Sequence, residues 1–301
     1  MSGATLARDQ RTIGKALSPE LQKALGKVTE ISSLPEITTK IVEIVEDPRA
    51  SARDMHEIIK RDPALAAKIL KVVNSAFYGL PAQIASLDRA IMMLGLSAVK
   101  NIALAASLSR MFKADAISSQ FAARDVWKHC ISVAVGARAL ASATKFAQVD
   151  EAFVAGLVHD MGLIVAQQLN ARKLREVAER CYNNPEERFC AVEEAVIGAD
   201  HQALGSALAG KWRFPPGLRY TIAYHHEPLT ILPEFRRIVA IIYVADTLCS
   251  ERQFGFYLTA RSQPLSDDVL AAAGLSADTV AAVAEELTTR VEEAEQILAI
   301  G

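Results

Sequence analysis

The chain has 301 residues, of which 51% are hydrophobic, enough to bury an extensive core in one large domain or two moderate ones. Its formal net charge of −2 provides no overall positive charge for binding nucleic acid or an anionic membrane. It has no apolar run long enough to cross a bilayer, no signal-peptide core and no CxxC pair among its four cysteines, so we expect a cytoplasmic protein with reduced, structural cysteines.

Helix signals recur along the chain, whereas the period-two alternation of a strand is hard to find. Ser51 and Asp54 have the spacing of a capping box, and Asp62 is a helix cap followed by Pro63 at the first helical position. The apolar residues after Pro63 repeat at helical spacing and end at Asn74. These signals predict an all-α fold.

A boundary between two helical parts is predicted at residues 113–121, where an alanine-rich apolar helix gives way to a polar start. We therefore divide the chain into an N-terminal extension (1–24), an N-terminal helical subdomain (25–116), a second helical subdomain (117–262) and C-terminal helices (263–301). The segment 276–301 has the pattern of a capped amphipathic helix, which could equally pack on the core or bind a partner.

The segment GLVHDMGLIV, at residues 156–165, places His159 and Asp160 side by side among apolar residues. Buried ionisable groups are costly unless they are paired, hydrogen-bonded or bound to a metal. The pair therefore needs partners from elsewhere in the chain.

Five of the six histidines lie between residues 129 and 226, beside apolar residues of predicted helices. Imidazole and carboxylate together suit iron, manganese or zinc, and a shared carboxylate, here Asp160, can bridge two ions. Asp246 is predicted in a buried helix, where an ionised carboxylate needs a cation or several hydrogen bonds. The candidate metal ligands are His129, His159, Asp160, His201, His225, His226 and Asp246.

Each of these residues alone has a simpler explanation, because a single buried histidine or aspartate usually holds a hydrogen bond or a helix cap. For Asp200, which precedes His201, we favour the cap. The full set is harder to explain in this way, since every member would need its own account. His56 has charged neighbours and is predicted on a solvated helix face.

The same residues resemble those of a known family. WKHC (127–130), GLVHDMG (156–162), ADHQALGSALAGKWRFP (199–215), YHHEP (224–228) and VADTL (244–248) resemble, in order, the ligand series of the HD superfamily of metal-dependent phosphohydrolases. The segment from LPEITTK to NIAL, at 34–104, resembles the N-terminal part of an HDOD domain, the HD-related output domain of bacterial signalling proteins. The resemblance covers roughly residues 25–250.

This resemblance implies an N-terminal helical subdomain packed on an HD-type subdomain. It also implies a regulatory role in bacterial signal transduction, with other signalling proteins as partners. When the pattern of the related HD-GYP phosphodiesterases is carried over, its ligand positions fall on the seven candidates, and Asp125 takes the place of an additional acidic ligand. The resemblance implies one or two divalent ions, with iron or manganese favoured over zinc or nickel.

Two departures from the phosphodiesterase pattern argue against catalysis. Those enzymes carry a lysine in HDxGK, where this chain has Leu163, which can neither hold a phosphate oxygen nor protonate a leaving alkoxide. They also carry a GYP element after the paired histidines, where this chain has HHEPLTILPEF, so cyclic-di-GMP is not the expected substrate. We therefore expect a non-catalytic regulatory protein whose metal site braces the fold or binds a phosphorylated ligand.

Two alternatives remain open. One is an active metal-dependent phosphohydrolase that acts on a nucleotide or phosphate ester, with Asp160 as its catalytic residue. The other is a partner-binding scaffold in which Phe77, Tyr78 and Leu80, beside Gly79, form an exposed apolar docking feature. Packing between the two subdomains is the simpler explanation of these apolar residues.

Overall fold

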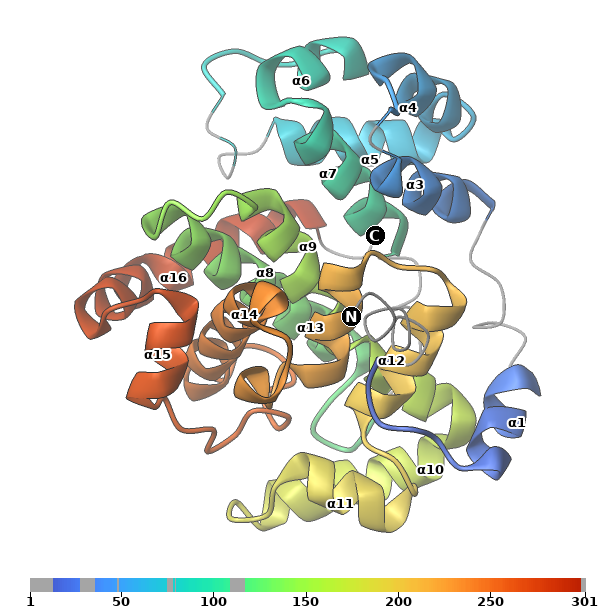
Figure 1. The fold of residues 1–301 in the computed structure, drawn as a ribbon, viewed down its shortest axis with the longest axis vertical. Coiled ribbons are helices and arrows are strands. Elements are labelled where there is room, and N and C mark those ends of the chain that lie inside the picture. The colour runs from blue at the N-terminus through green and yellow to red at the C-terminus, as the bar shows by residue number, and fades with distance from the viewer. Residues whose placement is uncertain are drawn as a thin grey trace, which may run out of the picture.

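Figure 1 shows a computed structural model, which describes residues 13–27, 36–47, 49–74, 78, 80–108 and 117–298. Every regular element within these ranges is a helix, so the prediction of an all-α fold is confirmed. No helix in the described part of the chain combines the length and apolar character needed to cross a membrane.

One group of helices gathers at one end of the molecule (Figure 1). It comprises α3 (Glu36–Glu46), α4 (Ala52–Ile59), α5 (Pro63–Val73), α6 (Leu87–Leu94) and α7 (Leu96–Leu108). Ser51 and Asp54 form the predicted capping box of α4, and Asp62 caps α5 by accepting the Leu65 N–H at 2.9 Å. Helix α7 packs against α3, α5 and α6 and also contacts α9 of the second group, which joins the two groups.

The second group contains the helices from α8 to α16, which pack around one central helix. It comprises α8 (Ala123–Ala143), α9 (Val149–Val158), α10 (Met161–Asn183), α11 (Phe189–Val196), α12 (His201–Lys211), α13 (Pro216–Tyr224), the 3₁₀ helix η2 (Pro228–Thr230), α14 (Pro233–Glu251), α15 (Asp267–Ala273) and α16 (Ala277–Leu298). Helices α9, α14 and α16 pack around α8. Because Leu287, Val291 and Ala294 of α16 are buried, the C-terminal helix packs on the core.

The N-terminal segment lies against the second group of helices, because residues 13–15 contact α11, α12 and α13. The Lys15 Nζ atom lies 2.8 Å from Asp200 Oδ2 and 2.7 Å from Glu194 Oε1. The backbone N–H of Gly14 donates to the Tyr224 hydroxyl at 3.2 Å. Helix α1 (Pro19–Lys27) follows this segment and packs on α10.

Some residues singled out by the sequence lie outside the described ranges. Phe77 and Gly79 of the predicted docking feature are among them, as are residues 113–116 of the predicted boundary. The described Tyr78 packs against the core, and the guanidinium of Arg138 on α8 lies 4.8 Å from its ring centroid. This contact between the two groups of helices supports the packing explanation for Tyr78.

Two glycines let helices approach with their backbones almost in contact. A Cβ at Gly156 of α9 would lie 2.7 Å from the Ala134 Cα of α8. A Cβ at Gly162 of α10 would lie 1.8 Å from the His201 carbonyl oxygen at the start of α12. Because real Cβ atoms do not approach other atoms so closely, these two contacts fix the spacing of helices that carry candidate site residues.

Gly156→Ala is expected to lower the free energy of unfolding by about 1–3 kcal/mol, because the added methyl group would overlap the backbone of α8. Denaturation by urea measures the change. Gly136→Ala on α8 is the matched control, since its Cβ would meet its nearest neighbours at 3.5 Å, and we expect it to leave stability unchanged or slightly raised. Equal stabilities of the two variants would contradict the close approach of α8 and α9.

Candidate metal centre

Five histidines and two aspartates meet in the interior of the second group of helices. They are His129 on α8, His159 and Asp160 between α9 and α10, His201 at the start of α12, His225 and His226 after α13, and Asp246 on α14. His226 is 9% exposed, and the other six are completely buried. The structure therefore brings together all seven residues that the sequence singled out as candidate ligands.

The His159–Asp160 pair lies at a sharp junction of two helices. Helix α9 ends at Val158 and α10 begins at Met161, so the pair alone joins them. The His159 ring donates from Nδ1 to the Gly156 carbonyl at 2.6 Å, which satisfies an acceptor at the end of α9. This contact turns the other ring nitrogen of His159 toward the centre.

The Asp160 carboxylate lies between two sets of imidazoles. Its Oδ1 atom is 3.3 Å from the Nε2 atoms of both His201 and His225. Its Oδ2 atom is 3.5 Å from His159 Nε2 and 3.9 Å from His129 Nε2. Among the described residues, four groups of potential ligand atoms lie within 4.8 Å of one another, and two of them contain Asp160: one with His201, His225 and His226, the other with His129 and His159. Asp160 is common to both groups, which is the arrangement of a carboxylate that bridges two ions.

All five rings are held from outside the cluster through Nδ1. The acceptors are the carbonyl of Phe254 for His129, of Gly156 for His159, and of Thr221 and Ile222 for His225, with Glu193 Oε2 for His201 and Gln263 Oε1 for His226. Because these oxygens only accept, each Nδ1 carries a proton and each Nε2 atom faces the cluster, where His129 Nε2 lies 3.0 Å from Asp246 Oδ1. Outer partners of this kind orient the histidine ligands of metal ions.

The side-chain amide of Gln263 has a defined orientation. Its Nε2 group donates to the Tyr243 carbonyl at 3.2 Å and to the Thr247 hydroxyl at 2.8 Å. Because the Tyr243 carbonyl can only accept, Oε1 must be the atom that faces His226. The proton of a neutral His226 is therefore on Nδ1, and its Nε2 atom is available to a metal ion.

Three imidazole nitrogens converge so closely that a cation has to lie among them. His201 Nε2 is 3.2 Å from the Nε2 atoms of both His225 and His226. Three neutral rings would direct lone pairs at one another. Burial disfavours a charged ring, but the carboxylate of Glu193 outweighs it and raises the pKa of His201 to about 9. A proton on His201 fills this role in the metal-free protein, and a bound metal ion would replace it.

The remaining charges also suit a metal ion. Burial lowers the pKa of His159 to about 4, which keeps this ring neutral and able to ligate. Burial works against ionised Asp160 and Asp246, but the surrounding histidines hold the pKa of both carboxyls below their usual range. Among the described residues, His159 Nε2 and Asp246 Oδ2 have no hydrogen-bond partner although both are buried. A metal ion would satisfy both atoms, so the donor set fits the implied group.

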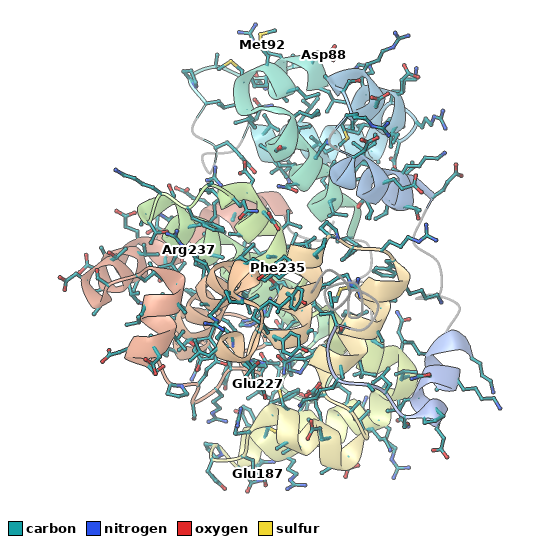
Figure 2. All side chains as sticks on the ribbon, in the orientation of Figure 1. Asp88, Met92, Glu187, Glu227, Phe235 and Arg237 are labelled. Carbon is teal, nitrogen blue, oxygen red and sulfur yellow. The ribbon has the colours of Figure 1, made fainter. Side chains whose placement is uncertain are left out.

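Three further residues named from the sequence lie outside the cluster. Asp200 is the N-cap of α12, where it accepts the Ala203 N–H at 2.8 Å, so its predicted role as a cap is confirmed. Asp125, expected as an additional ligand, instead accepts the Ala122 N–H at 2.6 Å at the start of α8. His56 lies on α4, 3.2 Å from an Asp88 oxygen, and Figure 2 places Asp88 at the outer end of the N-terminal helices.

Sequence reasoning missed several residues that form hydrogen bonds with the candidate ligands, among them Glu193, Thr259 and Gln263. Glu193 is completely buried and accepts both the ring N–H and the backbone N–H of His201. The Thr259 hydroxyl donates to Asp160 Oδ2 at 3.2 Å, and Gln263 accepts from His226. The apolar Phe189, four residues before Glu193 on the same helix face, could have indicated that Glu193 points inward. Thr259 and Gln263 follow α14 in a loop and carry no comparable signal.

The fold and the cluster together define a helical domain of the HD type. A family model described as the HDOD domain matches residues 31–228. This chain belongs to the HDOD family.

One relative matches this chain at low sequence identity. A protein of Treponema pallidum (strain Nichols), described only as uncharacterized, is 25% identical over 257 residues, which are 80% of this chain and 48% of the relative. This chain therefore spans about half the length of that relative.

Solved structures with the same fold differ in the names they carry. An HDOD domain protein of unknown function from Geobacter sulfurreducens has a TM-score of 0.75 and 22% identity, over 93% of this chain and 100% of that one. A protein from Marinobacter aquaeolei VT8, provisionally named a signal transduction protein, has a TM-score of 0.75 and 21% identity, over 96% of this chain and 62% of that one. A protein from Shewanella amazonensis SB2B, provisionally named a phosphohydrolase, has a TM-score of 0.69 and 20% identity, over 92% of this chain and 98% of that one. At these identities the similarity shows the fold alone.

Metal binding near neutral pH is expected to release protons, because His201, with a pKa of about 9, must lose its proton to ligate. The apparent affinity for Mn²⁺ should rise about tenfold per pH unit for each proton released, and level off above the pKa of His201. Calorimetry in buffers of different ionisation enthalpy counts the protons. Glu193→Gln is the control, since it keeps an acceptor but removes the charge that raises this pKa, and it should release fewer protons. Equal release by both proteins would contradict the role of Glu193.

Proposed function

We propose that this chain is a cytoplasmic regulatory domain of bacterial signal transduction whose divalent-metal centre braces the HD-type helices and receives a phosphorylated ligand without hydrolysing it. The observation that carries the proposal is the convergence of three histidine Nε2 atoms beside the Asp160 carboxylate, with His201 Nε2 3.2 Å from its two neighbours. Only a cation relieves this crowding, and one that is held by several helices stabilises the folded chain.

The donor set supports one or two ions of iron or manganese. Imidazole nitrogen with carboxylate oxygen suits these metals and also accommodates zinc or nickel. Asp160 belongs to both groups of ligand atoms and would bridge two ions. The ligands come from α8, α12, α14 and the segments after α9 and α13, so a bound ion would tie the second group of helices together.

The surroundings of Leu163 support a regulatory role rather than catalysis. Leu163 occupies the position of the phosphodiesterase lysine, and its side chain is completely buried in the core. A metal ion in this centre would supply Lewis acidity and lower the pKa of bound water. No proton donor for a leaving alkoxide is available from Leu163, because a hydrocarbon side chain cannot donate one.

The metal content of chelator-free, tag-free protein tests the proposal. We expect one to two equivalents of iron or manganese by elemental mass spectrometry, and their loss in Asp160→Ala with a lower melting temperature. Asp125→Ala is the matched control, because it removes an aspartate outside the ligand groups and should keep the metal. A metal ratio near zero in the unmodified protein would overturn the proposal and leave these residues as a polar core.

The second candidate function is a metal-dependent phosphohydrolase that acts on a nucleotide or phosphate ester. The observation that favours it is a cavity of about 380 Å³ lined by His226, Arg188 and Arg261, which gives a ligand access to the centre. In this case Asp160 would be the catalytic residue that holds the ions.

Phosphate release from a panel of nucleotides, by protein loaded with manganese or iron, separates the two functions. We expect no release above the background of the Asp160→Ala variant. Release that disappears in Asp160→Ala but persists in Asp125→Ala would replace the regulatory proposal with the catalytic one.

A further inference from the structure

A cavity of about 380 Å³ borders the candidate metal centre at His226. One wall is residues 185–190, which lead into α11, and the other is the loop 259–264 that follows α14. Tyr243 of α14 also lines it, and His226, the least buried of the candidate ligands, forms part of its surface. We call this cavity the arginine pocket, after Arg188 and Arg261, one from each wall.

The wall of the arginine pocket is hydrogen-bonded to the centre at two points. Thr259 donates to Asp160 Oδ2 at 3.2 Å, and Gln263 accepts from His226 at 2.7 Å. Both residues line the cavity. A molecule in the pocket would therefore lie against the immediate partners of two ligands, including the carboxylate shared by the two groups.

The charges on the two walls favour an anion. Arg261 donates from one guanidinium nitrogen to the carbonyls of Cys181 and Tyr182, which anchors it and leaves its other two nitrogens for further bonds. Arg188 is exposed at the start of α11. Of the two acidic residues in the lining, Glu187, labelled beside α11 in Figure 2, pairs with Arg180 at 2.6 Å, and Glu186 is exposed.

The backbone at the start of α11 adds to this preference. Phe189 and Cys190, the first residues of the helix, line the pocket. Backbone N–H groups in the first turn of a helix have no partner within the helix, and the helix dipole favours negative charge there. These amides and the two guanidinium groups therefore favour the same kind of ligand.

We propose that the arginine pocket is a phosphate subsite, in which Arg188 and Arg261 hold the phosphate group of a phosphate ester that reaches the metal centre past His226. The inference rests on the proposed function, because the ligand is shared with the metal centre. Guanidinium groups bind phosphate through paired hydrogen bonds and stay protonated in proteins, so they bind but do not supply a catalytic proton. The pocket thus provides affinity for phosphate without replacing the lysine that is absent at Leu163.

Phosphorus-31 NMR of inorganic phosphate tests the subsite on the full chain, loaded with Mn²⁺ and desalted to remove unbound ions. Phosphate bound near the paramagnetic ion should show strong line broadening. Arg188→Gln combined with Arg261→Gln should weaken phosphate binding by about tenfold or more, because charge-assisted hydrogen bonds are lost, with metal content unchanged. Arg172→Gln is the matched control, since Arg172 is exposed on α10 and is not part of the pocket lining.

The possible outcomes separate this inference from the proposed function. Metal-loaded protein that shows no broadening, or equal broadening in the double variant and the unmodified protein, would overturn the subsite and leave the metal centre standing. Protein that retains no metal would overturn the metal centre. In that case, phosphate affinity measured by calorimetry still decides the subsite: a loss in the double variant supports it, and equal affinity overturns it.

Discussion

The structure depends on the balance of charge in a cluster from which water is almost excluded. An ionised carboxylate in such surroundings costs several kcal/mol unless it is paired. Four histidine Nε2 atoms lie within 3.9 Å of the Asp160 carboxylate oxygens, and His129 Nε2 lies 3.0 Å from Asp246. Each ring is fixed by an acceptor behind it, so the helices that carry these residues cannot shift without exposing or unpairing a buried charge.

The sequence predicted the helices and singled out the seven residues that converge in the centre, because both depend on local patterns. The capping box at Ser51 and the cap at Asp62 form as their spacing predicts, since their partners lie three residues away. Outer partners depend on tertiary contacts instead. Thr259 reaches Asp160 across 99 residues of sequence, and no periodic pattern encodes such a contact. Asp125 was expected as an additional ligand because it lies one turn before His129. Its carboxylate instead accepts a backbone N–H at the start of its own helix.

The two groups of helices are connected through α9, which ends beside a candidate ligand of the centre. Helix α9 ends next to His159, and the same helix contacts α7 of the N-terminal group. The backbone of α9 is also pressed against α8 at Gly156, so it has little freedom to bend independently of the helix that carries His129. Any rearrangement of the centre that moves His159 therefore acts on the junction between the two groups.

The loop after α14 holds three of the ligands from behind, through the Phe254 carbonyl, the Thr259 hydroxyl and the Gln263 amide. Gly255 in this loop has a φ of 65°, and a Cβ there would lie 2.2 Å from the Asp125 carbonyl oxygen, so the loop is fixed against α8. The whole loop lies beyond residue 228, where the family match ends. The centre of this chain therefore depends on a segment that the family match does not cover, and the match alone does not define the partners that orient the candidate ligands.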